Sequence, residues 1–155
     1  MMVPGAAGEE DVSVEGKIDR LDRGPSGWAV IDYKSGSVRK ADLKQKLLET
    51  EFQLPLYLLA ARTAGATRAV HAAWVGLKTG EPLSLMEVVE AAKAGTLEEM
   101  LITDPSARKR IEEEGKRNLA NAVHALVGEL RRGRFAARPR DCEFCSYREI
   151  GRAHV

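Results

Sequence analysis

The sequence predicts an α/β fold in which a mixed central β-sheet is flanked by helices. Residues 12–34 read as a hairpin, because two strand-like runs are joined by a Gly/Pro/Ser cluster at residues 24–27. A leucine-rich stretch over residues 40–63 has near-helical spacing, and a strand-like run over residues 70–78 follows it. An amphipathic pattern over residues 106–132 adds a long helix.

Size and composition describe one soluble globular domain. The chain has 155 residues, of which 44% are hydrophobic and 30% are charged. Its net charge of +1 gives no overall positive field toward a polyanion. No stretch approaches the roughly 18 apolar residues of a membrane span, and the N-terminus lacks the pattern of a signal peptide. We expect a cytoplasmic protein whose residues 1–11 are a disordered lead-in.

The hairpin brings three chemically important side chains together. If Arg23 and Trp28 close its loop, Asp19 lies opposite Asp32, with Cβ atoms about 4.5–5.5 Å apart. Lys34 follows Asp32 by two residues and therefore points to the same face. Two carboxylates this close favour a cation between them or a retained proton. The pattern predicts a divalent metal site beside a lysine; the alternative is a surface Asp32–Lys34 ion pair with Asp19 as a turn residue.

The stretch over residues 40–63 presents a second pair of polar side chains. Pro55 is expected to kink this helix or to start a second one, with a break near residues 49–51. Gln53 and Tyr57 are four apart and share one helix face. Their amide and hydroxyl groups both donate and accept hydrogen bonds, so the pair can hold a phosphate, a metal-bound water or a catalytic lysine. The alternative is two ordinary polar residues on a helix surface.

The C-terminal half completes the expected fold. Residues 83–89 are expected to pair back on the third strand as a fourth strand, and Gly133 is expected to end the helix over residues 106–132. Five arginines fall between residues 131 and 140 and are either a solvated helix end or a phosphate-contacting surface. They are Arg131, Arg132, Arg134, Arg138 and Arg140.

These residues suit hydrolysis of a phosphodiester bond. Asp19 and Asp32 would hold Mg²⁺ or Mn²⁺, with the backbone carbonyl of Tyr33 as a further ligand. Such a metal lowers the pKa of a bound water and polarises the phosphate. Lys34 would position or deprotonate the attacking water and offset the charge that develops on phosphorus.

Three motifs in this order resemble the PD-(D/E)XK nuclease superfamily, specifically its RecB-like branch, which includes the RecBCD, AddAB and Cas4 nucleases. They are Gly16-Lys17-Ile18-Asp19-Arg20-Leu21-Asp22, Asp32-Tyr33-Lys34-Ser35-Gly36 and Gln53-Leu54-Pro55-Leu56-Tyr57. The resemblance covers about residues 12–152 and implies a restriction-endonuclease-like fold with a nuclease core over residues 12–140. It also implies that Asp19 and Asp32 bind metal, that Lys34 is catalytic, and that Gln53 and Tyr57 support them; Arg20 and Asp22 would fix the hairpin.

The tail, residues 141–155, resembles a degenerate iron–sulfur segment of AddB-type nucleases. Cys142 and Cys145 are present, but Gly151 stands where the third cysteine would be, and no cysteine occurs upstream. A [4Fe–4S] cluster needs four thiolates, so this chain alone cannot hold one. Zinc would have Cys142, Cys145 and His154 at unusual spacing. We expect the two cysteines to be a remnant that packs the tail.

A helix before the first strand is usual in this family, often with a histidine or glutamate that completes the metal site. None of His71, His124 and His154 precedes Asp19. Either the chain is a piece of a larger protein, or a partner supplies the helix, or the metal site is incomplete. We expect His71 and His124 to be surface or core residues.

The resemblance implies an exonuclease-like DNA nuclease of a recombination or repair system. No Walker-type phosphate loop is present, so a helicase or ATPase would be a separate domain or subunit. DNA contacts would be mainly to phosphates, with the arginines of residues 131–140 as candidates. The rival is a catalytically idle nuclease fold used for DNA binding or subunit docking, and a small-molecule phosphoesterase is a third interpretation.

Overall fold

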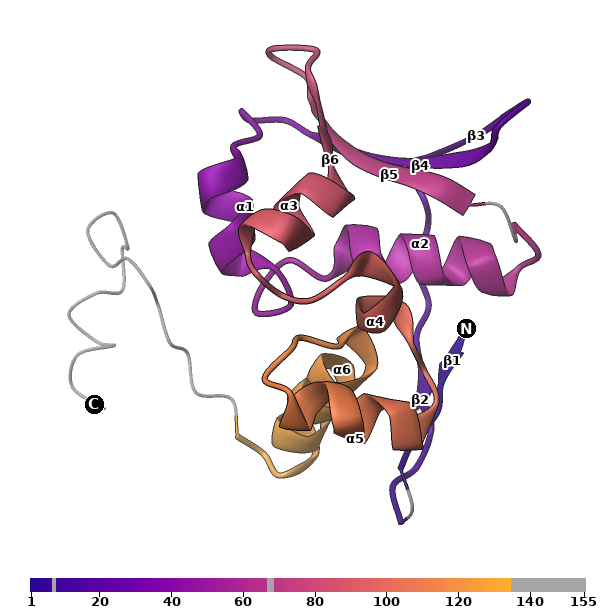
Figure 1. The fold of residues 1–155 in the computed structure, drawn as a ribbon, viewed down its shortest axis with the longest axis vertical. Helices are drawn as coiled ribbons and strands as arrows, with labels where there is room; N and C mark the ends of the chain where they lie inside the picture. The colour runs from indigo at the N-terminus through magenta and orange to yellow at the C-terminus, as the bar shows by residue number, and fades with distance from the viewer. Residues whose placement is uncertain (7, 67–68, 135–155) are drawn as a thin grey trace, which may run out of the picture. The chain divides into compact units, whose positions relative to one another are not determined.

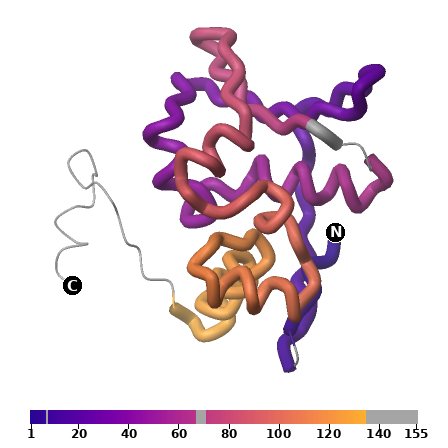
Figure 2. The backbone as a smooth tube through the Cα atoms, viewed as in Figure 1, coloured from indigo at the N-terminus to yellow at the C-terminus, as the bar shows by residue number. Residues whose placement is uncertain are grey.

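The computed structural model of this chain describes residues 1–6, 8–66 and 69–134, with the backbone alone described at residues 69 and 70 (Figures 1 and 2). The chain divides into two units, residues 1–125 and residues 126–155. The sheet and its covering helices belong to the first unit. The expected tail of residues 141–155, with both cysteines and His154, lies outside the described residues.

A four-stranded mixed sheet forms the centre of the first unit. Its strand order is β3-β4-β5-β6, and the strands are β3 (Arg20–Gly24), β4 (Gly27–Lys34), β5 (Ala69–Gly76) and β6 (Pro82–Ser84). The β4–β5 pair is parallel, whereas β3–β4 and β5–β6 are antiparallel. Arg23 lies opposite Trp28, as the hairpin pattern predicts. The predicted mixed sheet flanked by helices is confirmed.

Two helices connect β4 to β5. Helix α1 (Lys40–Lys46) and helix α2 (Gln53–Thr63) are separated by a turn, as predicted from Pro55. Pro55 is the third residue of α2, where its missing N–H costs no helical hydrogen bond. Within the turn, Leu48 is left-handed, with φ of 56°. The backbone carbonyl of the preceding residue, Leu47, accepts a hydrogen bond from Arg117 Nη1 at 2.6 Å.

Helix α2 packs against β4 and β5 and buries one face of the sheet (Figure 1). Val30 of β4 and Trp74 of β5 are fully buried there, as are Leu54 and Leu58 of the helix. Asp32 lies two residues after Val30 on the same face of β4. The apolar core therefore extends up to a carboxylate at the C-terminal end of a central strand.

The prediction of a strand over residues 83–89 is wrong for most of that range. Only β6 (Pro82–Ser84) pairs with β5, and helix α3 (Leu85–Ala91) follows at once. Leu85, Val88 and Val89 are buried and have i, i+3, i+4 spacing, which matches a helix and not a strand. A short apolar run does not distinguish the two structures without this spacing.

The single helix expected over residues 106–132 is also wrong. Helix α5 (Pro105–Glu113) ends before Gly115, whose φ of 71° is left-handed, and helix α6 (Leu119–Arg131) starts anew. The buried Asn118 side chain accepts a hydrogen bond from Asn121 N at 3.1 Å, which caps α6. Its amide donates to the backbone oxygens of Glu99 and Ile102, both at 2.9 Å.

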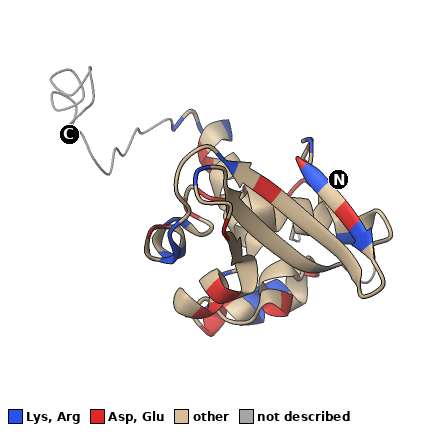
Figure 3. Cartoon of the chain, turned by 90° about the horizontal axis from the view of Figure 1, so that it is seen from above, with Lys and Arg blue, Asp and Glu red and all other residues tan. Residues whose placement is uncertain are grey.

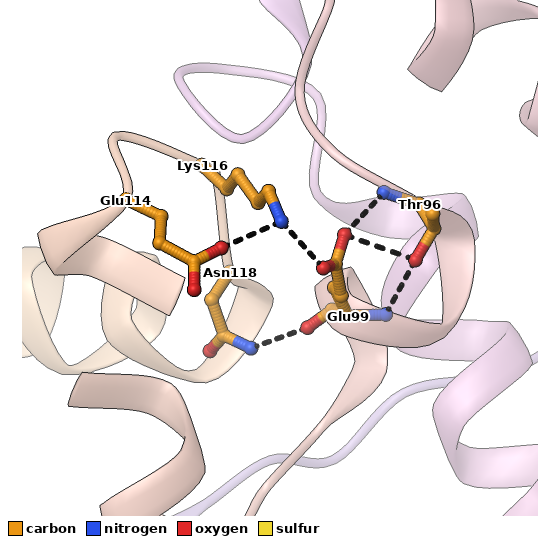
Figure 4. A network of polar contacts seen from close by, with 5 residues as sticks. All are labelled: Thr96, Glu99, Glu114, Lys116 and Asn118. Atoms are coloured by element: carbon orange, nitrogen blue, oxygen red, sulfur yellow. Dashed lines mark hydrogen bonds and ion pairs between the residues drawn. The ribbon is translucent and has the colours of Figure 1, made fainter. Parts of the chain in front are cut away.

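Helix α4 (Leu97–Leu101) begins with a capping box that ties it to the α5–α6 loop (Figure 4). Thr96 Oγ1 accepts from Glu99 N at 3.2 Å, and Glu99 Oε2 accepts from Thr96 N at 2.8 Å. Glu99 Oε1 also accepts a hydrogen bond from Lys116 Nζ at 2.7 Å. Lys116 contacts Glu114 as well, at 2.6 Å. The network is a structural device that holds a five-residue helix in place.

The first residues are not the disordered lead-in expected from composition. Strand β1 (Met2–Val3) pairs with β2 (Val12–Ser13) in a two-stranded sheet, and Val3 is fully buried. His124 supports this segment through Nε2, 2.9 Å from the Pro4 carbonyl. Burial of Val3 and Val12 overrides the polar, glycine-rich composition between them. Among the described residues, no helix combines the length and the apolar character needed to cross a bilayer.

Candidate active site

Strand β4 places a buried carboxylate and a lysine side by side at its C-terminal end. Asp32 is 1% exposed, and its Oδ2 atom lies 3.0 Å from Lys34 Nζ. The two groups form an ion pair, and no group of the described structure other than Lys34 contacts Asp32 Oδ2 as a donor. The carboxylate oxygen therefore keeps lone pairs available to a cation.

The first turn of α2 supplies a further partner for Lys34. Lys34 Nζ donates to Gln53 Oε1 at 3.1 Å, and Gln53 Nε2 donates to the Tyr57 hydroxyl at 2.8 Å. The amide thus accepts from the lysine and donates to the tyrosine, so its orientation is fixed. The structure brings together Lys34, Gln53 and Tyr57, the residues that the motifs predict to cooperate.

Glu51 is a site residue that the sequence patterns did not single out. Its Oε1 atom lies 3.3 Å from Lys34 Nζ, and its side chain is only 14% exposed. The residue sits in the turn between α1 and α2, which was interpreted only as a helix break. The signal that would have found it is an acidic residue two positions before Gln53, at the start of the helix that reaches the lysine.

Asp19 contacts β4 through its side chain. The strand β3 begins one residue later, at Arg20, so the paired ladder stops short of Asp19 and Asp32. Asp19 Oδ2 instead accepts a hydrogen bond from the backbone N–H of Tyr33 at 3.1 Å. Arg20 contributes to the same hairpin, since its guanidinium donates to Asp22 at 2.9 Å and to the Tyr33 hydroxyl at 3.0 Å. Figure 3 shows these alternating charges along the hairpin.

The electrostatics of the site favour an additional positive charge. Burial raises the pKa of Asp32; Lys34 opposes this shift, and the negative charges of Asp19 and Glu51 add to it. Burial lowers the pKa of Lys34, but its contacts with Asp32 and Glu51 outweigh the burial, and the pKa is raised. Lys34 is therefore protonated at neutral pH. Two carboxylates, Asp32 and Glu51, contact this single ammonium group, and Asp19 adds a further negative charge that acts on Asp32.

The residues fit a hard divalent cation held by two carboxylates. Asp32 offers a buried oxygen that is paired with Lys34, and Asp19 is close enough to raise the Asp32 pKa. Mg²⁺ is commonly bound through one or two carboxylates and keeps several waters. Within residues 1–6, 8–66 and 69–134, no three acidic, histidine or cysteine side chains are arranged to hold a metal. Water and the Tyr33 carbonyl would have to complete the ligand set.

The family model for the PD-(D/E)XK nuclease superfamily matches residues 3–150 of the chain. The chain belongs to the PD-(D/E)XK nuclease superfamily. The match spans both the hairpin and α2, the two segments that form the Lys34 site. Searches of curated proteins and of solved structures gave no match.

Of the five arginines predicted to contact DNA, three lie within the described residues and are exposed. Arg132 Nη1 is 3.0 Å and Arg134 Nη1 is 3.5 Å from Glu129 Oε1, so one glutamate offsets part of their charge. Arg131 also takes part in an interaction. Arg138 and Arg140 lie outside the described residues. A DNA-binding role for this group remains a prediction of the nuclease interpretation.

Proposed function

We propose that this PD-(D/E)XK chain is a Mg²⁺- or Mn²⁺-dependent nuclease that hydrolyses phosphodiester bonds in DNA. The observation that carries the proposal is the contact of Lys34 Nζ with Asp32 on one side, at 3.0 Å, and Gln53 on the other, at 3.1 Å. A buried carboxylate, a lysine and an oriented amide converge at one strand end. Asp32 and Lys34 belong to the second of the three motifs quoted above, and Gln53 belongs to the third.

Each residue has a distinct task in this proposal. Asp19 and Asp32 would hold the metal, which when bound supplies an activated water and polarises the phosphate. Lys34, whose pKa is raised by Asp32 and Glu51, would bind a phosphate oxygen and stabilise the charge that develops during hydrolysis. Gln53 would fix the lysine, and Tyr57 would fix Gln53. Glu51 would hold the ammonium group in place from the third side.

The test is cleavage of linear single- and double-stranded DNA with Mn²⁺, comparing the unmodified chain with Asp32→Ala and Lys34→Ala. We expect each substitution to lower the single-turnover rate by about 10²–10³, the effect of removing one preorganised stabilising group. Lys78→Ala, an exposed lysine in the β5–β6 turn, is the matched control and should cleave normally. Equal cleavage by all four proteins would reject this assignment of the site.

One observation favours the idle-module alternative. The described residues supply two carboxylates near each other but no third acidic, histidine or cysteine ligand. With an incomplete metal site, the chain would bind DNA without cutting it, or would dock onto another subunit. Mn²⁺ binding that depends on Asp19 and Asp32, without cleavage of any DNA, would favour this alternative.

The proposal also includes an exonuclease-like role in recombination or repair, beside a helicase or ATPase domain or subunit. Its support is the resemblance of the three motifs to the RecB-like branch. Blocking both ends of a linear duplex, or circularising a single strand, separates the possibilities. Loss of degradation on blocked or circular DNA supports an exonuclease, whereas unchanged cleavage would reject it.

A further inference from the structure

A pocket of about 520 Å³ lies directly beside the Lys34–Gln53–Tyr57 chain of hydrogen bonds. Gln53 and Tyr57 form part of its lining, so the same two side chains face both the lysine and the pocket. The remaining walls come from α2, through Leu56 and Ala60, from the segment before β3, and from Met1 at the N-terminus. Its volume is within the range of about 300–1,000 Å³ that is typical of ligand sites.

The chemistry of the lining separates this pocket from the lysine. Val14, Ile18, Leu56 and the Tyr57 ring give it apolar walls, while Glu15 and Gln53 provide hydrogen-bonding groups. None of the side chains named above is that of a Lys or Arg, and the N-terminal ammonium of Met1, which also lies in the lining, donates to the Val14 carbonyl at 2.8 Å. The flat, apolar face and the polar edge of a nucleobase find both kinds of partner in such a lining.

Gly16 leaves room in front of the tyrosine. A Cβ atom at this position would lie 3.7 Å from Tyr57 Cε1, which is ordinary contact, so a glycine is not forced by crowding. A longer side chain at Gly16 would occupy the space at the ring edge. The first glycine of the hairpin motif thus keeps one wall of the pocket open.

We propose that this pocket binds one unpaired base of the DNA strand that is cut, stacked on Tyr57, while a neighbouring phosphate lies at Lys34. The inference rests on the proposed nuclease function and adds its substrate class, DNA that is single-stranded or frayed at the site of cleavage. An intact duplex keeps its bases stacked and paired, so it would have to open before a base could enter.

The experiment uses short single-stranded oligonucleotides of about eight nucleotides in which one abasic position is moved along the strand. Binding is measured by fluorescence anisotropy in EDTA, and single-turnover cleavage is measured with Mn²⁺. We expect one abasic position to weaken binding about tenfold, and to lower cleavage at one fixed neighbouring bond similarly, as loss of a base–aromatic stack does. Other abasic positions should have little effect.

Two variants fill the pocket from opposite walls. Ala60→Phe places a ring in it from α2, and Gly16→Leu fills it from the hairpin side. Both variants should bind the intact oligonucleotide about as weakly as the unmodified chain binds the abasic one. In both variants, removing the base should weaken binding no further. Ala64→Phe is the matched control, since Ala64 is exposed one helical turn later and does not line the pocket. It should retain the full abasic penalty.

The outcomes distinguish this inference from the proposed function. A position-specific abasic penalty in EDTA that both filled variants lose supports base binding, even if no DNA is cleaved with Mn²⁺. Cleavage with no abasic penalty at any position overturns the pocket and leaves the nuclease intact. A higher Tm for the filled variants with an unchanged abasic penalty also overturns it, since the space would then be a packing gap or a place for another protein segment.

Discussion

The carboxylate of Asp19 accepts a hydrogen bond from the backbone N–H of Tyr33 at 3.1 Å. This contact continues the hairpin beyond the last paired residues and holds a negative charge next to the end of β4. An asparagine has the same shape and the same acceptor oxygen, but it lacks the charge. The two contributions of Asp19, to the hairpin and to the charge of the site, are therefore separable.

We predict that Asp19→Asn leaves the fold intact and weakens metal binding. The free energy of unfolding should change by less than about 0.5 kcal/mol, because the hydrogen bond to Tyr33 is retained and the site is exposed. The affinity for Mn²⁺ should fall by about tenfold or more, equal to about 1.4 kcal/mol. Calorimetric titration of Mn²⁺ and urea unfolding measure the two quantities. Unchanged Mn²⁺ affinity would remove Asp19 from the metal site.

Asp32→Asn should lower the cleavage rate as strongly as Asp32→Ala and should stabilise the metal-free protein at pH 7. Burial of the ionised carboxylate, next to Asp19 and Glu51, outweighs its attraction to Lys34, as the raised pKa of Asp32 indicates. Removing the charge should raise the stability by roughly 1 kcal/mol and Tm by about 2–4 °C. Thermal unfolding in EDTA gives the comparison. A lower Tm would mean that the ion pair with Lys34 stabilises the fold.

Glu99→Gln should alter the acid limb of the stability curve. A hydrogen bond from Lys116, followed by one from the backbone of Thr96, lowers the pKa of Glu99 to about 2. Because the folded pKa lies below the unfolded value of about 4.3, this carboxylate contributes stability that is present above that value and is lost as pH falls toward 2. The unmodified chain should therefore lose stability more steeply between about pH 4.5 and pH 2 than the variant.

Urea unfolding at a series of pH values measures this difference for Glu99. Glu113→Gln, at an exposed position of α5, is the control and should keep the slope of the unmodified chain. Parallel slopes for Glu99→Gln and the unmodified chain would show that the contacts with Lys116 and Thr96 do not lower the pKa of Glu99 in solution.

Arg108→Met should make the protein more stable. The Arg108 side chain is 2% exposed, yet its Nε and Nη1 atoms have no hydrogen-bond partner in the described structure. An unsatisfied buried polar group costs about 1–3 kcal/mol, and methionine fills a similar volume without that cost. We expect Tm to rise by at least about 2 °C, whereas Arg110→Met on the exposed side of α5 should be neutral. A decrease in Tm with Arg108→Met would indicate a partner for this guanidinium.

The sequence predicted those contacts of the site that depend on turn geometry, strand alternation and helical spacing. The Gly24–Gly27 turn sets the register of Arg23 opposite Trp28, and strand alternation places Lys34 on the face of Asp32. Helical spacing then puts Tyr57 beside Gln53. Each of these steps depends on residues close together in the chain, so a sequence pattern is sufficient.

The parts that were missed depend on contacts between distant segments. Glu51 reaches Lys34 only because α2 folds back on β4, and no local pattern marks that contact. The break between α5 and α6 is fixed by Asn118, whose amide donates to carbonyls of α4 some twenty residues earlier. The placement of β1 beside β2 rests on burial of Val3 and on the contact of His124 with Pro4. Hydrophobic periodicity alone carries no information about these tertiary contacts.

All three motifs end by Tyr57, yet the turn that delivers Glu51 and Gln53 to Lys34 is fastened by Arg117. Its guanidinium donates to the Leu47 carbonyl at 2.6 Å and approaches Glu49 within 3.7 Å, next to the left-handed Leu48. A chain shortened before Arg117 would retain every residue of the candidate chemistry and lose the clamp on that turn. In the proposed nuclease, a substitution in the α5–α6 loop would therefore change turnover while every motif residue stays the same.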